Sequence, residues 1–447
     1  MRQSGFLTMI GMVLALGLSA CAGELVETPV IVEETPTAPL PEGSSVLPAS
    51  RGLSLERGLE AATPTPNAQA ALQAVSVRVW WPEELYPQDA GAAENVLLAQ
   101  FEDFRLTYTS YVLEVRRKRT NGMGGILPTL RTASPVAPSA MPDLTLMRRA
   151  DMVTAATEGL IVPLENWLPP DLMGDLLPGT RALGEIDGVL YGLPYTLNIY
   201  HNVYRISPSE QVPLTFAGVL EQQPVYLFPA GALSGNWTLL LQYRAAGGRL
   251  VDDSGSSVLD RPALVTVLDY YAKAVEAGIF DPSLLNYADV DGYWDSFVST
   301  GIDMAAVDSA TYLRRKSSLH NVGVTPIPTE SGSPVTALDG WVWVLTTQDP
   351  DRQTRARAFL SWMMRISEQS LFSEAFGILP SQKRALRLWE DQDYAQFAQG
   401  LVAAAELIPD TQRTGGAAEA LQTGLAAVLE GASAETAADA ALGQLGQ

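Results

Sequence analysis

The chain has 447 residues, of which 47% are hydrophobic and 18% are charged, so it is long enough to bury a sizeable core. Acidic residues outnumber basic ones by 50 to 29, and the formal charge of −21 disfavours nucleic acid and anionic lipid surfaces as partners. One Cys and two His exclude a disulfide framework, a thiolate zinc site and a His-rich metal cluster, so no cofactor is expected.

The first residues have the layout of a secretory signal. Arg2 gives a positive start, an apolar stretch covers residues 6–18, and small residues precede Cys21. The stretch is shorter than the roughly 20 apolar residues that a membrane span needs. We therefore expect residues 1–20 to be a signal peptide. An uncleaved anchor, or an ordinary signal with an incidental Cys, is the alternative.

The end of this segment resembles the lipobox of bacterial lipoproteins. Leu18-Ser19-Ala20-Cys21 has the lipobox pattern, and the only Cys of the chain stands where that family carries its lipid. The resemblance implies lipid attachment at Cys21, which would hold the protein at the outer side of the bacterial cell membrane.

Residues 21–71 are rich in Pro, Thr and Ala and have little hydrophobic periodicity. Such a segment cannot bury enough apolar area to offset the loss of chain entropy on folding. As a random coil it would span about 40 Å. We interpret it as a linker that spaces a globular body from the membrane. A tail without a spacing role would look the same.

The remaining chain alternates predicted strands and helices. Strand patterns cover residues 75–80, 111–115, 143–147 and 341–345. Helix patterns cover residues 95–104, 151–158 and 262–277, a segment that begins after Asp349-Pro350, and most of the chain from residue 395 onward. This succession predicts an α/β fold with a mainly parallel sheet.

Sequence templates for catalysis are missing. No Lys follows a Gly, so no phosphate-binding P-loop exists, and no Gly-x-Ser-x-Gly elbow is present. His201 and His320 lie in no general-base motif and are expected to be structural. Asp289-Val290-Asp291-Gly292 lacks the spacing of a calcium loop, so no metal site is expected. A glycosidase needs only two carboxylates, and composition does not exclude one.

Several stretches, in order along the chain, resemble the extracellular solute-binding proteins of ABC transporters, family 1. The clearest is residues 187–195, which resemble a Gly-x-x-Tyr-Gly-Leu-Pro motif. The others are weak singly and gain weight from their shared order: residues 141–144, 160–164, 200–202, 213–216, 247–262, 297–304, 324–328, 339–341 and 377–380. Many members of this family are sugar-binding lipoproteins with a fold similar to that of maltose-binding protein.

The resemblance implies a two-lobed α/β fold of the type II periplasmic-binding-protein kind, with the lobes joined by a hinge of two or three chain crossings. The crossings would fall near residues 195–199, 336–340 and 379–381. The lobes would then be, first, residues 72–196 with 341–379 and, second, residues 197–340 with 381–447. The ligand would lie between the lobes, which close around it by a hinge motion.

A sugar has apolar C–H faces and a rim of hydroxyls, so aromatic rings together with carboxylates and amides are suited to bind it. Core packing is the alternative role for every aromatic candidate, and Trp343 should face the same side of its strand as Trp341. The candidate ligand-binding residues are Trp80, Trp81, Asp143, Tyr195, Asn198, Asn236, Trp237, Tyr312, Asp339 and Trp341.

These features lead to one functional hypothesis. The chain is a lipid-anchored receptor that captures a carbohydrate, in the form of an oligosaccharide, and delivers it to the permease subunits of an ABC importer without bond chemistry. A secreted glycoside-acting enzyme, or the same fold with a polyamine or peptide ligand, are the alternatives. The family is usually monomeric. The basic segment at residues 116–139, and Asp339 in place of the family's Gly, leave the ligand's identity open.

Overall fold

The computed structural model describes residues 75–88, 91–164, 167–207, 211–232, 236–299, 301–407 and 411–445. The predicted signal peptide, the lipid attachment at Cys21 and the linker at residues 21–71 lie outside these ranges. The described residues belong to one compact unit, Pro66–Gln447.

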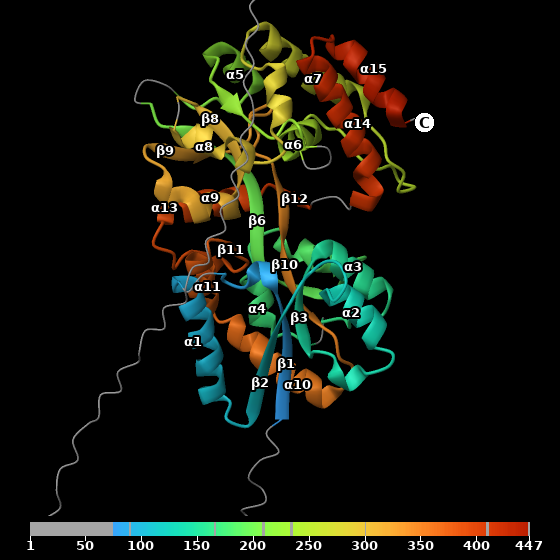
Figure 1. Ribbon diagram of the computed structural model, residues 1–447, viewed down its shortest axis with the longest axis vertical. Helices are drawn as coiled ribbons and strands as arrows, with labels where there is room; N and C mark the ends of the chain where they lie inside the picture. Colours follow the sequence, from blue (N-terminus) through green and yellow to red (C-terminus); the bar gives the residue numbers. More distant parts are fainter. Residues whose placement is uncertain are drawn as a thin grey trace, which may run out of the picture. The chain divides into compact units, whose positions relative to one another are not determined.

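The first half of this unit is built on three parallel strands and two long antiparallel ones. Strands β1 (Val75–Pro82), β2 (Tyr111–Lys118) and β3 (Leu144–Arg148) run parallel in the order β2-β1-β3. Strand β10 (Thr336–Leu345) pairs antiparallel with β3, and β6 (Gly192–Arg205) pairs antiparallel with β10. Figure 1 shows β6 and β10 running side by side through both halves of the unit.

The second half is built around the far end of β6. Strands β8 (Met304–Asp308) and β9 (Val322–Thr325) pair antiparallel with it, and β7 (Tyr226–Leu227) runs parallel to β8. The helices of this half, seen in the upper part of Figure 1, are α5 (Phe216–Gln222), α6 (Trp237–Ala245), α7 (Arg261–Glu276), α8 (Asp291–Ser299), α9 (Ser309–Arg315), α14 (Thr411–Leu429) and α15 (Ala434–Leu445).

The sheet is mixed, so the prediction of a mainly parallel sheet is wrong. The reason lies in β6 and β10, which are fourteen and ten residues long and each serve both halves. The two strands run antiparallel to each other; β10 is also antiparallel to β3, and β6 to β8, β9 and β11 (Leu379–Pro380), whereas β10 is parallel to β12 (Ala405–Leu407). In the sequence, only residues 341–345 of β10 have a strand pattern, and β6 is marked only by family motifs. The length of both strands was therefore not predicted.

The predicted elements of the first half are confirmed within a few residues. Its helices are α1 (Ala92–Thr107), α2 (Ile126–Ala133), α3 (Arg149–Thr157), α4 (Pro170–Gly174), α10 (Pro350–Met363) and α11 (Ile366–Phe376). Helix α10 begins where the sequence predicts, because Asp349 accepts hydrogen bonds from the backbone N–H groups of Asp351 (2.8 Å) and Arg352 (3.2 Å). Helix α3 ends at Gly159, whose φ of 69° few other residues adopt readily.

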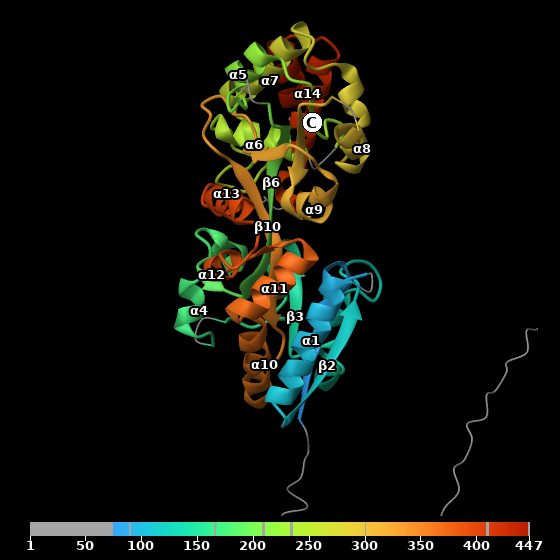
Figure 2. The same ribbon diagram turned by 90° about the vertical axis from the view of Figure 1, so that its left-hand side faces the viewer.

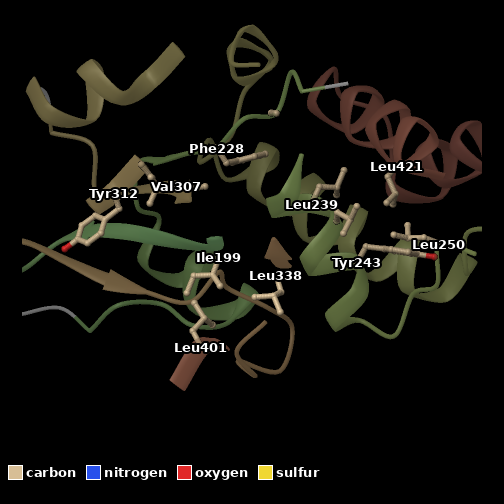
Figure 3. Close-up of a cluster of buried hydrophobic side chains, with 14 of the residues drawn as sticks. Ile199, Phe228, Leu239, Tyr243, Leu250, Val307, Tyr312, Leu338, Leu401 and Leu421 are labelled. Carbon is tan, nitrogen blue, oxygen red and sulfur yellow. The ribbon is translucent and has the colours of Figure 1, made fainter. Parts of the chain in front are cut away.

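Side-chain alternation along β1 divides the first half into two layers. Val77, Val79 and Trp81 face one hydrophobic cluster, which α1, α10 and α11 cover, whereas Trp80 belongs to the cluster on the other face, beside α2 and α3. Figure 2 shows α1, α10 and α11 together on their side of the strands. The second cluster continues into the other half, where Figure 3 shows Tyr312 close to Val307 and Leu239 close to Tyr243.

The three segments expected as hinge crossings lie side by side in the sheet. Strand β11 (Leu379–Pro380) pairs with Leu197 and Thr196 of β6, and Leu338 of β10 pairs with Ile199. The next helix, α12 (Lys383–Leu386), stays with the first half, because the Lys383 N–H donates to the carbonyl of Asp175 (2.8 Å). A proposed boundary between the lobes therefore falls after α12. The remaining elements are β4 (Glu185–Ile186), β5 (Val189–Leu190), α13 (Gln392–Val402) and β12 (Ala405–Leu407).

Candidate ligand-binding site

The topology offers one edge of the first half as a place for a ligand. The parallel strands β1, β2 and β3 end at this edge, where Arg148 of β3 pairs with Trp341 in the middle of β10. Ligands of α/β sheets bind outside the carboxyl ends of the strands. A cavity of about 800 Å³ lies at the opposite end, and Val75, Arg78, Asp143 and Arg352 are among the residues that line it. Its Arg352 pairs with Asp143 at 2.5 Å, so its charges are internally compensated.

An aromatic pair stands beside the middle of the long strands. Tyr200 lies on β6, and Trp237 is the first residue of α6, which Asn236 caps by accepting from the Leu239 N–H (3.1 Å). Their ring centroids are 5.1 Å apart, with an interplanar angle of 34°. Both rings are half-buried. They rest on a small apolar cluster that includes Ile327 and Ala337, which holds them in place.

Two carboxylates lie close to this pair. Asp308 is opposite Tyr200 in the β6–β8 register, so the two side chains share a face of the sheet. It accepts from the Thr311 N–H (3.1 Å) and hydroxyl (2.6 Å) and so caps α9. Asp289 accepts from the Gly292 N–H at 3.2 Å. Both acids line a cavity of about 210 Å³ together with Tyr200 and Trp237.

A further polar group comes from the first half. Asp339 of β10 is opposite Asn198 of β6, and its carboxylate pairs with Arg148 at 2.5 Å. The Arg148 guanidinium lies 4.7 Å from the Trp341 ring centroid. Asn198 Oδ1 accepts from the Ser309 hydroxyl (2.8 Å) and the Ala310 N–H (3.0 Å). Amide, carboxylate and guanidinium thus stand together along the long strands.

The charged groups of this region act on one another's ionisation. Burial raises the pKa of Tyr200 far above its usual value, Asp308 and Asp339 raise it further, and Arg148 opposes them. Burial also raises the pKa of Asp151 at the start of α3, where Arg148 lowers it and Glu84 raises it. A chain of neighbouring charges therefore runs from Glu84 to Asp308 along the carboxyl edge.

A further cavity, of about 330 Å³, lies beside Glu84, between the end of β1 and the loop after β2. It is lined by Glu83, Glu84, Gln88, Arg119, Thr120 and Asn121. The Thr120 hydroxyl donates to the Glu84 carboxylate. Hydrogen-bonding groups of both signs suit a ligand with many hydroxyls.

The sequence model of the bacterial extracellular solute-binding proteins matches residues 114–399, nearly two thirds of the chain. The chain belongs to this family. Its working place is accordingly extracytoplasmic, and the resemblance seen in the sequence is confirmed. No helix within the described ranges is both long and apolar enough to span a membrane. No curated protein matches the sequence.

Solved structures of binding proteins share the fold of this solute-binding protein. Maltose-bound MalE3 of T. maritima superposes with a TM-score of 0.62 at 18% identity, covering 83% of this chain and 99% of that one. The cyclic alpha-maltosyl-1,6-maltose binding protein of Arthrobacter globiformis gives 0.65 at 19% identity, covering 83% and 98%. MalE of Xanthomonas citri gives 0.65 at 16% identity, covering 83% and 96%. The predicted two-lobed α/β fold is thereby confirmed.

Three of the candidate residues named from the sequence belong to the group of aromatic and polar side chains around Tyr200, here called the Tyr200–Trp237 cluster. They are Asn198, Trp237 and Asp339. Trp341 borders this cluster through Arg148, although its side chain is 2% exposed and packs in the first hydrophobic cluster with Trp343, on the face where both were expected together. Asn236 and Tyr312 lie behind the cluster. Asn236 donates to Gln422 (3.2 Å), and Tyr312 packs between the rings of His201 and Tyr394.

The other candidates lie inside the first half. Trp81 and Tyr195 are fully buried, with ring centroids 6.2 Å apart. Trp80 is buried on the opposite face, where the Lys118 ammonium covers its ring at 4.6 Å. Asp143 is buried at the amino end of β3, where it accepts from the Arg78 N–H (2.8 Å) and pairs with Arg352. These four have structural contacts and are not included in the proposed contact surface.

Sequence reasoning missed Tyr200, Arg148, Asp308 and Asp151. Tyr200 stood in a family stretch and was not singled out as a contact. Asp308 gave a usable signal, because an Asp directly after the apolar run 304–307 and three residues before a Thr has the pattern of a helix cap at a strand end. Arg148 and Asp151 gave none, since only the β3–β10 register brings them to the site.

Proposed function

We propose that this solute-binding protein is the receptor of an ABC importer and captures a carbohydrate, in the form of an oligosaccharide, at the Tyr200–Trp237 cluster. The observation that carries the proposal is a half-buried aromatic pair beside the Asp339 carboxylate of β10, the Asn198 amide of β6 and the Arg148 guanidinium of β3. Ring faces match the C–H faces of a pyranose, and the polar groups match its hydroxyls. Three of the solved neighbours have maltose, maltotetraose and mannobiose bound, which supports the sugar class.

An extended ligand fits the arrangement better than a single ring. The aromatic pair lies at one end of the chain of charges and the cavity beside Glu84 lies at the other. A ligand that contacts both must reach along the carboxyl edge. The family lobes would close around it, and the closed form would be presented to the permease.

We also propose that a lipid is attached at Cys21 and that residues 21–71 are a linker. The chain would pass between the lobes in the middle of β6, in the middle of β10 and after α12. A lipid-anchored receptor of this kind performs no bond chemistry and works as a monomer. Release of products from an oligosaccharide would instead support a glycoside-acting enzyme.

The test is a thermal shift of the purified protein with a panel of neutral and charged oligosaccharides. A specific ligand raises the melting temperature by mass action. Trp237→Ala should abolish the shift. Trp167→Ala, a matched truncation of a Trp that lies under Arg357 in the first half, should keep it. No shift with any sugar for the wild-type protein, or an unchanged shift in Trp237→Ala, would overturn the proposal.

A further inference from the structure

The cavity of about 210 Å³ in the second half has an unusual combination of walls. Its lining includes the rings of Tyr200, Trp237 and Tyr293, the imidazole of His201 and the carboxylates of Asp289 and Asp308. Three aromatic side chains and several aliphatic ones surround two carboxylates. The Tyr293 hydroxyl donates to the carbonyl of Ala306 (2.5 Å), so this ring is fixed in the wall.

The acids of this cavity have no cationic partner within the part of the chain that the structure describes. Asp289 and Asp308 accept only from backbone N–H groups and from the Thr311 hydroxyl. The lining contains no Lys or Arg. His201 supplies no charge at neutral pH, because burial lowers its pKa to about 4.

The guanidinium that acts on Tyr200 belongs to a different pair. Arg148 acts on Tyr200 electrostatically, but it is bound to Asp339 at 2.5 Å and stacks on Trp341. Asp339 and Arg148 compensate each other, so the two acids of the cavity stay unbalanced. A neutral sugar would leave this imbalance unchanged on lobe closure, when water is excluded and the electrostatic cost of unpaired charge rises.

An ammonium group satisfies both features of the cavity. Aromatic faces attract cations, more strongly as the site is desolvated, and carboxylates add charge-assisted hydrogen bonds. We infer that the cavity binds a protonated amino group and that the ligand is an amino sugar oligosaccharide. The inference rests on the proposed carbohydrate receptor and names its substrate class. The ammonium would lie between the Tyr200–Trp237 pair and the carboxylates of Asp308 and Asp289.

The experiment compares three matched trimers and an amine without sugar at pH 6, where amino groups are protonated. The probes are a β-1,4-linked glucosamine trimer, its N-acetylated form, cellotriose and spermidine, measured by calorimetry. We expect the glucosamine trimer to bind about tenfold more tightly than cellotriose, which differs from it only at the amino positions. The advantage should shrink in 0.5 M salt, because charge interactions are screened.

Two variants make the comparison specific. Asp308→Asn keeps a good helix cap while removing the charge, and Asp289→Asn keeps its turn. Each should bring the glucosamine preference over cellotriose below about threefold, because the charge that distinguishes the two trimers is removed. Asp393→Asn, an exposed acid of the same half outside this cavity, should keep the full preference.

The possible outcomes separate the two claims. Equal or tighter binding of cellotriose overturns the amino sugar inference and leaves the carbohydrate receptor standing. Binding of the glucosamine trimer with a preference that survives both Asn variants also overturns the inference. Binding of spermidine without any trimer overturns both claims.

Discussion

Two groups of Trp and Tyr residues in this protein have different surroundings. In the first half, Trp81, Tyr195 and Trp343 are fully buried and contact one another edge-on or tilted, with centroids 5.4–6.2 Å apart. Beside the long strands, Tyr200 and Trp237 are half-buried and lie next to carboxylates. Tyr195 and Tyr200 are five residues apart on the same strand.

Residue type and position on a strand therefore do not predict whether an aromatic side chain packs in the core or lies beside charged groups. The core group has ring neighbours on several sides and stabilises the fold through burial. The pair at the cluster has apolar support on one side and charged groups on the other. The following predictions test whether this division of roles holds.

The largest effect on stability is expected for Trp343→Ala. Removing a fully buried Trp should lower the free energy of unfolding by about 3–5 kcal/mol, since it removes apolar burial and leaves a cavity. Urea unfolding is the measurement, and Trp237→Ala is the matched control, with a clearly smaller loss. Similar losses for the two variants would show that Trp237 is also a core residue.

The same contrast applies to two ion pairs. Arg352→Ala leaves the Asp143 carboxylate, which is 1% exposed, without its partner, and should cost at least about 3 kcal/mol. Arg148→Ala breaks a pair whose Arg side chain is 47% exposed, and should cost less than about 1 kcal/mol. Both are read from urea unfolding at neutral pH. A loss for Arg148→Ala as large as that for Arg352→Ala would contradict the assignment of the Asp339 pair to the site.

His201 gives a pH-dependent prediction for the region behind the aromatic pair. Burial lowers its pKa to about 4, whereas an unfolded His titrates near about 6.5. Between these pH values the unfolded chain binds a proton that the folded chain does not, so stability is lost as the pH falls. The loss attributable to His201 is about 3 kcal/mol by pH 4.

The variant His201→Gln isolates this contribution. The Gln side chain can hydrogen-bond to the Tyr394 hydroxyl, as His201 does, but it does not titrate. Urea unfolding at pH 7 and pH 4 should show a smaller stability loss for the variant than for the wild-type protein. Equal losses would mean that His201 is protonated in the folded state.

The smallest effect on stability is expected for Asp339→Asn, together with a clear effect on binding. The Asp339 side chain is 22% exposed and its partner is more so, hence the unfolding free energy should change by less than about 1 kcal/mol. Affinity for the sugar ligand should fall about tenfold. In the proposed site, the Asp339 carboxylate accepts a hydrogen bond from a sugar hydroxyl and orients Arg148. Calorimetry on the variant, with Asp351→Asn as control, is the check. Unchanged affinity would remove Asp339 from the site.

Much of the fold is predictable from local patterns. Alternation along β1, the apolar run of β10 and the Asp349 cap of α10 are properties of short segments, and the structure confirms them. The direction of β10 and the extent of β6 depend on long-range pairing. No window of a few residues contains that information, which is why the mixed sheet was missed.

The site follows the same rule. Trp237 and Asp339 were named because each follows a recognisable stretch of sequence. Arg148 and Asp308 come from segments 160 residues apart and meet only through the registers of β3, β10, β6 and β8. Core and site aromatics are separated by the face and depth at which a strand places them. For Trp81 and Tyr195, burial supports a role in packing.

The most direct test of a carbohydrate receptor is mass spectrometry of small molecules released on denaturing freshly purified protein. The account predicts an oligosaccharide in the wild-type sample, with amino groups if the further inference holds, and its loss from Trp237→Ala prepared in parallel. A peptide or a polyamine released from the wild-type protein, retained in Trp237→Ala, would contradict it.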